Sequence, residues 1–483
     1  MSRSHISPNA LRVLYRLRDA GFMGFLVGGC VRDLLIGIEP KDFDVATDAL
    51  PEELKRLFRN CRLVGRRFRL AHVFFGREII EVATFRATSA PSQGDEPLPA
   101  ADPEDGESPE LDDEDSEPAD LPVIARPRSF GRGGGMAEGD DAGARMMDAS
   151  GRILRDNVYG TIDEDVWRRD FTANALYYNI ADFSIWDYVG GFEDVAGHTL
   201  KLIGDPETRF REDPVRMLRA ARFEAKLGFT IDPATARPIG ALRELLAAVP
   251  PARLFDETLK LFLTGHGARS YPVLRRRGLL AALLPTVEGY FASHPGSLVE
   301  KLLVQGLENT DARVAADKPV TPTFLFALLL YGPIAGIIEA TPPERWHELA
   351  TILDACDQAM REAQSRIAIP KRFSLGVREM FALQPRLEHP RGRRALRVLE
   401  HPRFRAAYDL LLLRAQFGLA PAEMAQWWTR LQEVSAEERG TMADALAGGP
   451  RSGAGTGAPR TDRAPRRRGG RRRGRRSPKP AAP

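Results

Sequence analysis

The sequence contains few cysteines and no signature of secretion. Its three cysteines, Cys30, Cys61 and Cys356, lie far apart and form no CxxC pair. This distribution argues against a disulfide framework and against a zinc site, so a reducing compartment, the cytoplasm, is expected. The N-terminal residues lack the apolar core and small-residue cleavage site of a signal peptide, and their spacing predicts an amphipathic helix.

Long apolar runs are also absent. The most apolar stretch, Phe324 to Ile338, is shorter than a bilayer span requires and is interrupted by Pro333, which favours a buried helix. No contact with a membrane is therefore expected. A GxSxG motif and a nucleophilic Cys-His pattern are missing too, which argues against a covalent enzyme intermediate. With 483 residues, the chain is long enough for two or three domains that each bury a core.

The net charge of +3 hides two segments of opposite sign. Residues 88–150 hold 17 acidic residues against 4 arginines, and residues 451–483 hold 11 arginines and 1 lysine against 1 aspartate. The acidic segment is rich in Pro and Gly, so it is interpreted as a disordered insertion, and a surface loop without function is favoured over an autoinhibitory strip that mimics RNA phosphate. The arginine tail suits phosphate contacts and stacking on bases, with a solubilising or lipid-attracted tail as the alternative.

The spacing of apolar residues changes near residue 200. Before it, short runs rich in β-branched and aromatic residues predict strands, as in GFMGFLVGG, KDFDVAT, LAHVFFG and EIIEVATFR. After it, apolar residues recur every three or four positions and predict helices packed on helices, as in ARLFDETLKLFL and FRAAYDLLLLRAQF. The expected fold class is a multidomain α+β protein in which a head with a small mixed β-sheet precedes all-α domains.

Two adjacent glycines, Gly28 and Gly29, lie between a predicted strand and a predicted helix. Such a junction points backbone N–H groups and a helix N-terminus at one place, which favours phosphate. Arg32 falls in the first helical turn, where its side chain can add positive charge. The alternative for the glycine pair is a tight turn without a ligand.

The next predicted strand carries two aspartates in the sequence KDFDVAT. The two-residue period of a strand places Asp42 and Asp44 on one face and Phe43 on the other. Carboxylates held that close repel each other unless a divalent cation neutralises them, and Mg²⁺ prefers a few carboxylates, water and substrate phosphates. The alternative is a solvent-facing strand end or turn.

A third carboxylate can come from Glu81, on a neighbouring predicted strand, or from Asp170 in RRDFTANALYY. For Glu81 the alternative is a solvent-facing residue of an edge strand. For Asp170 the alternative is a helix N-cap, and a capping residue can still serve a site. The sequence does not choose between the two residues.

A second cluster of charge follows in FREDPVRMLRAARF. Pro214 stands at an early helical position, and Arg216, Arg219 and Arg222 follow with a spacing of three, which aligns them as a stripe on one side of the helix. The alternative is a solvated charged face. Asp213, just before the helix, can cap it or accept hydrogen bonds from a base edge.

Three blocks occur in order along the chain: FLVGGCVRDLLIGIEPKDFDVAT, RRDFTANALYY and REDPVRMLRAARF. Together they resemble the signature blocks of the class II template-independent nucleotidyltransferases, the family of CCA-adding enzymes and bacterial poly(A) polymerases. Within this family the chain is most similar to the poly(A) polymerases, through residues 63–76, 367–373 and 399–415 and the arginine tail. The resemblance covers nearly the whole chain and fails only across residues 88–150, where the acidic insertion is longer than expected.

The resemblance implies a metal site and a nucleotide site. Asp42 and Asp44 are expected to hold two Mg²⁺ ions, for which Mn²⁺ can substitute, with Glu81 or Asp170 as the third carboxylate. The residues expected to hold the incoming nucleotide are Gly28, Gly29, Arg32, Arg169, Asp213, Arg216 and Arg219. Among these, Asp213 and Arg216 are implied to form a protein template that reads the base edge and selects adenine.

The implied function is template-independent addition of AMP from ATP to RNA 3′ ends, by two-metal phosphoryl transfer with release of pyrophosphate. A CCA-adding tRNA nucleotidyltransferase is the alternative of the same class. A noncatalytic RNA-binding protein that acts through its Arg-rich tail is the alternative of another class. The expected partners are ATP, RNA 3′ ends and RNA-decay proteins, and the chain is expected to be a monomer.

The implied domain boundaries follow the change in the spacing of apolar residues near residue 200. A nucleotidyltransferase head is expected over residues 1–195, interrupted by the insertion at 88–150. A nucleotide-selecting helical neck follows over 196–270 and an RNA-binding helical body over 271–447, and the disordered Arg-rich tail closes the chain over 448–483.

Overall fold

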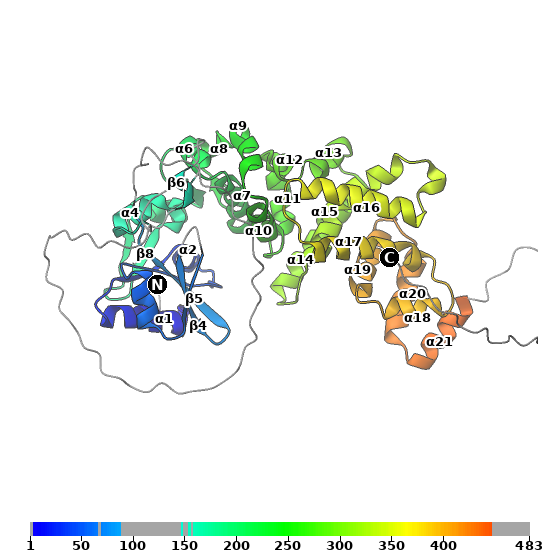
Figure 1. The fold of residues 1–483 in the computed structure, drawn as a ribbon, viewed down its shortest axis with the longest axis horizontal. Helices are drawn as coiled ribbons and strands as arrows, with labels where there is room; N and C mark the ends of the chain where they lie inside the picture. Colours follow the sequence, from blue (N-terminus) through cyan, green and yellow to red (C-terminus); the bar gives the residue numbers. More distant parts are fainter. Residues whose placement is uncertain (1–2, 66–68, 88–145, 148–152, 156–157, 447–483) are drawn as a thin grey trace, which may run out of the picture.

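The computed structural model describes residues 3–65, 69–87, 146–147, 153–155 and 158–446. These residues form an elongated molecule with an α/β head at one end and helices along the rest (Figure 1). The predicted fold class, a mixed-sheet head followed by all-α domains, is confirmed. The predicted acidic insertion lies outside the described residues except for strand β6 (Met146–Met147), and the predicted tail lies outside them entirely.

The head is built on a seven-stranded sheet in the order β3-β4-β5-β2-β1-β8-β9. Neighbouring strands are antiparallel except β2 and β5, which run parallel. The four strands predicted from the sequence are present, although β2 begins at Asp44, so Asp42 precedes the strand instead of lying in it. The strands are β1 (Gly24–Val27), β2 (Asp44–Thr47), β3 (Cys61–Val64), β4 (Leu70–Phe75), β5 (Glu78–Thr84), β8 (Leu176–Asn179) and β9 (Ile185–Asp187), and β7 (Ile153–Arg155) pairs with β6.

The two faces of the sheet carry different residues. Leu26 and Val45 point to one face, where α1 (Pro8–Asp19) and α3 (Pro51–Leu57) complete the main core. Phe25 and Ala46 point to the other face, where a smaller apolar cluster packs under α4 (Ile162–Arg168). Since side chains alternate along a strand, Asp44 shares this second face with Ala46. The candidate site therefore lies on the face with the smaller core.

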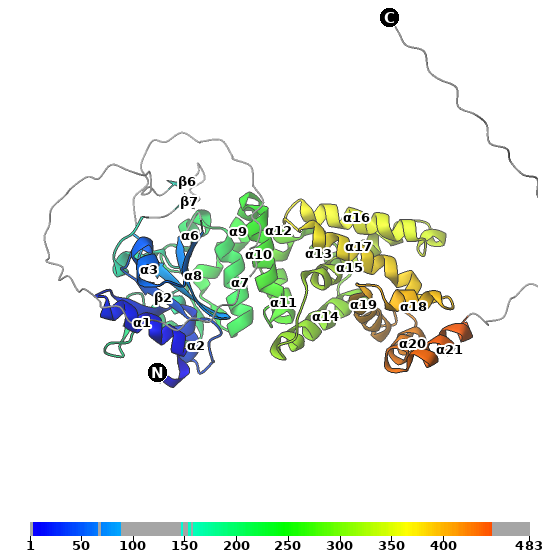
Figure 2. The same ribbon diagram turned by 60° about the horizontal axis from the view of Figure 1, so that its bottom comes forward.

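The neck joins the head through α5 and a two-stranded parallel sheet. The boundary predicted after residue 195 falls at the end of α5, and the neck helices pack beside the head (Figure 2). Helix α7 ends at Gly228, whose φ of +70° suits glycine at a helix C-terminus. The elements are α5 (Gly191–Ala196), β10 (Thr199–Leu200), α6 (Pro206–Glu212), α7 (Val215–Leu227), β11 (Thr230–Ile231), α8 (Pro233–Ala236), α9 (Ile239–Leu242) and α10 (Pro251–Phe262).

The body extends away from the neck as a layered set of helices (Figure 2). The boundary predicted between residues 270 and 271 falls inside α11, so one continuous helix passes through it. The body helices are α11 (Gly267–Arg276), α12 (Leu279–Leu283), α13 (Pro285–Ser293), α14 (Leu298–Ala315), α15 (Pro322–Glu339), α16 (Leu349–Gln364), α17 (Lys371–Glu388), α18 (Arg394–Leu399), α19 (Phe404–Gln416), α20 (Ala422–Glu433) and α21 (Ala436–Ala445).

Helix α15 corrects one prediction. The sequence suggested that Pro333 interrupts it, but the helix continues through Pro333 to Glu339. Proline removes one backbone N–H from the helix, and Pro333 and its neighbours are buried in the body. In the described part of the chain, α15 is the one helix long and apolar enough to cross a membrane, and 56% of it is buried inside the protein. Its burial agrees with the predicted core helix.

Candidate active site

The glycine pair forms the turn between β1 and α2 (Gly29–Leu35). Gly28 has a φ of +80° and a ψ of −132°, a backbone conformation that residues other than glycine rarely adopt. An added Cβ would meet nothing closer than 3.7 Å, so the backbone angle, not lack of space, requires glycine. The Nη1 atom of Arg169 lies 3.8 Å from the position of that Cβ. The structure thus brings two predicted nucleotide-binding residues together.

A row of polar residues crosses the sheet next to this turn. Asp44 on β2 is in register with Glu81 on the parallel strand β5, and Glu81 is in register with His72 on β4. His72 Nε2 lies 3.4 Å from Glu81 Oε1. Strand β5 is flanked on both sides, so Glu81 does not lie on an edge strand, although its side chain is exposed to solvent as the alternative stated. Asp44 and Glu81 therefore face the same side of the sheet as direct neighbours.

The surroundings of Asp44 disfavour the charged form of its carboxyl group. Its side chain reaches solvent, but the protein atoms packed around it displace much of the bulk water. This burial, followed by the charges of Glu81 and Asp42, raises the pKa of Asp44 from its usual 3.8 to about 6, although Arg169 acts to lower it. A divalent cation is the species that would relieve this repulsion.

The residues fit one kind of metal ion. Within the ranges that the structure describes, no three His, Cys, Asp or Glu side chains already surround a single point. Asp42 and Asp44 offer oxygen ligands only, and both are exposed. Mg²⁺ is commonly held by one or two carboxylates and completes its shell with water and substrate phosphates. The pair therefore suits Mg²⁺ better than an ion that needs a full protein cage.

Asp170 lies in a different network. One of its oxygens accepts Nε of Arg219 at 2.8 Å, and the other accepts the amide of Asn174 at 3.1 Å and the N–H of Phe171. Burial alone raises the pKa of Asp170, but the Arg219 ion pair and these hydrogen bonds outweigh it and hold the pKa well below its usual range. Asp170 precedes the short 3-10 helix Thr172–Asn174 without being its N-cap. These partners of Asp170 are Arg219, Asn174 and Phe171, whereas the strand neighbour of Asp44 is Glu81.

Arg32 belongs to the same network and is 2% exposed. Its guanidinium donates to Asp33 at 2.6 Å and 2.9 Å and to the side-chain oxygen of Asn174. Phe223 on α7 links this network to the neck, because the guanidiniums of Arg32 and Arg219 lie 5.3 Å and 5.4 Å from its ring centre. Arg32 thus lies beside the glycine turn, with its Nη2 3.5 Å from the Cβ position of Gly29, and links the head to the neck through Phe223.

Arg169 is held in place by two partners. Its Nε donates to the Tyr177 hydroxyl at 2.6 Å, and its Nη2 donates to Asp165 at 3.0 Å. The Tyr177 hydroxyl in turn donates to Asp165 at 2.7 Å. With Arg169 held in this way, its Nη1 lies beside Gly28, and its charge acts to lower the pKa of Asp44.

The neck presents a second buried network around Asp213. Arg253 on α10 forms a two-pronged ion pair with Asp213, with N···O distances of 2.7 Å and 2.6 Å. Arg216 donates to the Arg209 carbonyl at 2.8 Å, and both Asp213 and Arg216 are 8% exposed. Arg222 pairs with the buried Glu257. The arginine stripe of α7 is therefore packed and paired, and the alternative of a solvated charged face is wrong.

Several residues of the site gave no signal in the sequence. Arg253 lies in α10, outside the sequence blocks named above, although it pairs with both oxygens of Asp213. Arg209 connects the neck to the head, since its Nη2 donates to the backbone carbonyls of Arg168 and Arg169. Asn174 lies inside the RRDFTANALYY block, so that block pointed to the right segment but not to this side chain.

The raised pKa of Asp44 predicts a pH-dependent response to divalent metal ions. A carboxyl whose pKa is higher in the folded chain than in the unfolded chain stabilises the fold at low pH, and this contribution is lost as the pH rises through about 6. A bound cation competes with that proton. The gain in Tm from saturating Mg²⁺ should therefore be larger at about pH 8 than at about pH 5. Differential scanning fluorimetry measures it, and an equal gain at both pH values, or the same profile in Asp44→Asn, would contradict the assignment.

Three family models match the chain. "Poly A polymerase head domain" matches residues 24–201, "Probable RNA and SrmB- binding site of polymerase A" matches residues 228–290, and "Polymerase A arginine-rich C-terminus" matches residues 344–475. The second of these models falls on the neck and the first body helices, and the third reaches into the tail.

Relatives match the chain to different extents. Poly(A) polymerase I of Salmonella typhi is 44% identical over 474 residues, which are 97% of this chain and 91% of that protein. A CCA-adding enzyme of Lactobacillus helveticus is 30% identical over 264 residues, 55% of this chain and 52% of that enzyme. A solved tRNA nucleotidyltransferase, complexed with a primer tRNA and an incoming ATP analog, has a TM-score of 0.51 at 19% identity, covering 87% of this chain and 98% of that chain, and shows the shared fold.

Proposed function

Because the chain belongs to the bacterial poly(A) polymerase I family, it is a template-independent nucleotidyltransferase that adds AMP from ATP to RNA 3′ ends, and we propose that Asp42 and Asp44 form the centre of this reaction. The observation that carries the proposal is the register of Asp44 with Glu81 on neighbouring strands beside the glycine turn, because carboxylates held this close repel each other unless a divalent cation neutralises them. Enzymes of this family use divalent metal ions, and we propose Mg²⁺ here, with Mn²⁺ as a substitute.

The two aspartates act as metal ligands in this proposal. The bound ions supply activation of the RNA 3′-hydroxyl and neutralisation of the pyrophosphate leaving group. Asp42 precedes β2 and Asp44 begins it, so the strand fixes one ligand while the preceding segment carries the other. Glu81 adds negative charge next to Asp44, and His72 holds its carboxylate from the other side.

The triphosphate is proposed to lie along the glycine turn. Gly28 lets the backbone turn sharply, and Gly29 begins α2. Arg169 supplies positive charge from the side, held by Tyr177 and Asp165 so that its direction is fixed before ATP arrives. Arg32 and Arg219 support this surface from within, through Asn174 and Asp170.

Base selection is proposed for Asp213 and Arg216. A carboxylate has about four acceptor positions, so Asp213 can accept a hydrogen bond from the adenine amino group while Arg253 holds its two oxygens. Arg216 supplies donors for the acceptor nitrogen of the same base edge. The ion pair with Arg253 fixes the direction of the Asp213 carboxylate, which makes the reading of adenine specific.

The RNA-binding surface, the partner proteins and the oligomeric state complete the proposal. RNA and nucleoside triphosphates are the substrates of this family. We propose that the body and the tail carry the RNA, that RNA-decay proteins are partners, and that the enzyme works as a cytoplasmic monomer. The basic stretch at residues 275–277 is engaged internally, since Arg275 pairs with Glu288 and both Arg276 and Arg277 pair with Glu224.

Incubation of the protein with an unstructured RNA and each nucleoside triphosphate separately tests the function. Long products are expected with ATP alone. A CCA-adding enzyme would instead use CTP and stop after a few additions, and its match to this chain covers only 55% of the residues. Extension with CTP in preference to ATP would contradict the proposal. The absence of extension with every nucleotide would favour a noncatalytic RNA-binding protein.

The third carboxylate is testable by Mg²⁺ titration of activity. Glu81→Gln should raise the Mg²⁺ concentration for half-maximal activity about tenfold, because Glu81 lies beside Asp44. Asp170→Asn should leave this midpoint unchanged and lower the free energy of unfolding by about 3 kcal/mol, because it leaves Arg219 without its partner. The exposed Glu193→Gln serves as the control. A shifted midpoint in Asp170→Asn alone would reverse the assignment.

A further inference from the structure

A cavity of about 630 Å³ opens in the body between α14, α15 and α19. It lies on helices that carry none of the candidate active-site residues. We propose that it binds one unpaired nucleotide of the RNA substrate, so that the RNA is held at a second point away from the reacting 3′ end. This inference rests on the proposed function only in taking RNA as the substrate.

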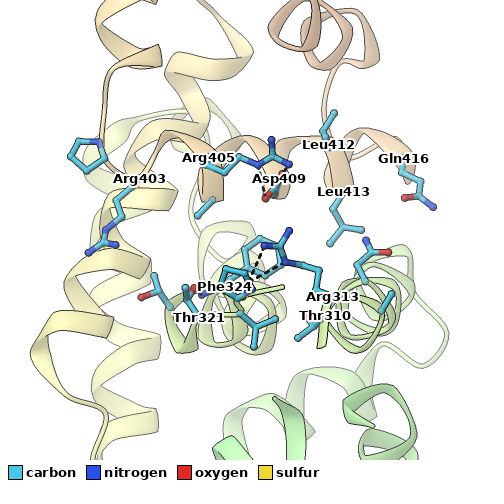
Figure 3. Close-up of a pocket in the computed structure, with 17 residues that line it drawn as sticks. Thr310, Arg313, Thr321, Phe324, Arg403, Arg405, Asp409, Leu412, Leu413 and Gln416 are labelled. Carbon is cyan, nitrogen blue, oxygen red and sulfur yellow. Dashed lines mark hydrogen bonds and ion pairs between the residues drawn. The ribbon is translucent and has the colours of Figure 1, made fainter. Parts of the chain in front are cut away.

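The size and the walls of the cavity suit a single base. Pockets that enclose small molecules have volumes of about 300–1,000 Å³. The ring of Phe324 on α15 and the side chain of Leu413 on α19 both line the space (Figure 3). An aromatic ring and an aliphatic side chain in one cavity can contact the face of any base, and this part of the cavity is called the slot below.

Positive charge surrounds the slot. Arg313, Arg403 and Arg405 line it together with the carboxylate of Asp409, and Arg403 also pairs with Glu379, outside the lining, at 3.2 Å. Arg313 donates to the Pro319 carbonyl at 2.8 Å and 3.2 Å, and Arg405 pairs with Asp409 at 3.1 Å (Figure 3). A guanidinium has five N–H donors, so arginines held in this way keep donors for a phosphate. The lining is therefore suited to the anionic backbone that accompanies a base.

The polar groups of the lining favour a nucleotide over an acidic peptide. Asn309 and Gln416 each offer an amide donor and an amide acceptor, and Asp409 offers a further acceptor. These groups can pair with the edge of a base. An acidic peptide would use the arginines but would leave the aromatic wall and the amides without a matching partner, so RNA is the occupant that accounts for all three features.

A variant that fills the slot tests the proposal. Ala312 lines the cavity and is exposed, whereas Ala315 on the same helix is exposed and does not line it. In the full-length protein with EDTA, fluorescence anisotropy measures the affinity for a short single-stranded oligoadenylate. Ala312→Trp should weaken binding about tenfold, the contribution of one stacked base, and Ala315→Trp should bind as the wild type does.

A second variant removes charge without adding bulk. Arg405→Gln should weaken binding and reduce the slope of log affinity against log salt by about 0.7, the value for one phosphate contact on a single strand. Arg397→Gln, an exposed arginine of α18 outside the cavity, is the matched control. Wild-type affinity in both Ala312→Trp and Arg405→Gln would overturn the proposal. Capture of an acidic peptide by the wild type but not by these variants would also overturn it.

The outcome is separable from the proposed function. Asp44→Asn should bind the oligoadenylate as tightly as the wild type, because Asp44 lies in the head and the slot lies in the body. If the wild type failed to incorporate AMP while the slot variants still lost RNA affinity, the reaction assignment would fail and the slot would stand.

Discussion

Asp44→Asn should lower the rate of AMP incorporation about 1,000-fold or more, because the loss of one metal ligand removes several kcal/mol of transition-state stabilisation. The substitution keeps the size of the side chain and removes the carboxylate of Asp44, whose pKa is raised by burial and by the charges of Glu81 and Asp42. The fold should remain intact, since β2 pairs with β1 and β5 through its backbone. Extension of a labelled RNA with ATP and Mg²⁺ measures the effect.

The exposed Asp19→Asn on α1 is the matched control for charge and should retain full activity. Binding of RNA by Asp44→Asn should equal that of the wild type, which separates loss of chemistry from loss of substrate. If Asp44→Asn kept more than about a tenth of the wild-type rate, the loss of rate would be too small for the loss of a metal ligand. In that case the catalytic centre would have to be sought elsewhere.

Arg253→Met should relax the choice of nucleotide. Without Arg253 the Asp213 carboxylate loses both of its short contacts at 2.6 Å and 2.7 Å and can turn to accept from cytosine as well as adenine. We expect the ratio of kcat/KM for ATP to kcat/KM for CTP to fall about 10-fold to 100-fold, which corresponds to one oriented hydrogen-bonding group. Single-nucleotide addition with each triphosphate measures this ratio.

Two further measurements distinguish selection from stability. Arg253→Met should also lower the free energy of unfolding by about 3 kcal/mol, since the buried carboxylate of Asp213 loses its ion pair with Arg253. Arg237→Met, an exposed neck arginine, should change neither quantity. If Arg253→Met lost stability but kept the ATP-to-CTP ratio, Arg253 would be a structural residue only, and the reading of the base would depend on other groups.

Local sequence patterns predicted much of the fold and part of the candidate site. Short runs rich in β-branched and aromatic residues identified β1, β2, β4 and β5, because such side chains favour strands. The glycine pair gave the turn before α2, since few other residues adopt the φ of Gly28. The spacing of three placed Arg216, Arg219 and Arg222 on one helix. These features depend on neighbours within about a turn of chain.

Local sequence patterns could not predict contacts between residues that lie far apart in the sequence. Arg32 and Asn174 are 142 positions apart, and Asp213 and Arg253 are 40 apart. The register of Asp44 with Glu81 depends on how β5 joins β2 in parallel, which no local pattern specifies. The sequence therefore left Glu81 and Asp170 as equal candidates, whereas their surroundings differ: Glu81 lies beside Asp44, and Asp170 is neutralised by Arg219.

Location of the metal ions is the most direct test of the Asp42 and Asp44 assignment. Crystals grown with Mn²⁺ and a non-hydrolysable ATP analogue would show the ions by anomalous scattering. The account predicts Mn²⁺ within bonding distance, about 2.2 Å, of carboxylate oxygens from both aspartates, with the triphosphate beside Gly28 and Gly29. Mn²⁺ bound at Asp170 or elsewhere, with Asp42 and Asp44 left without an ion, would contradict it.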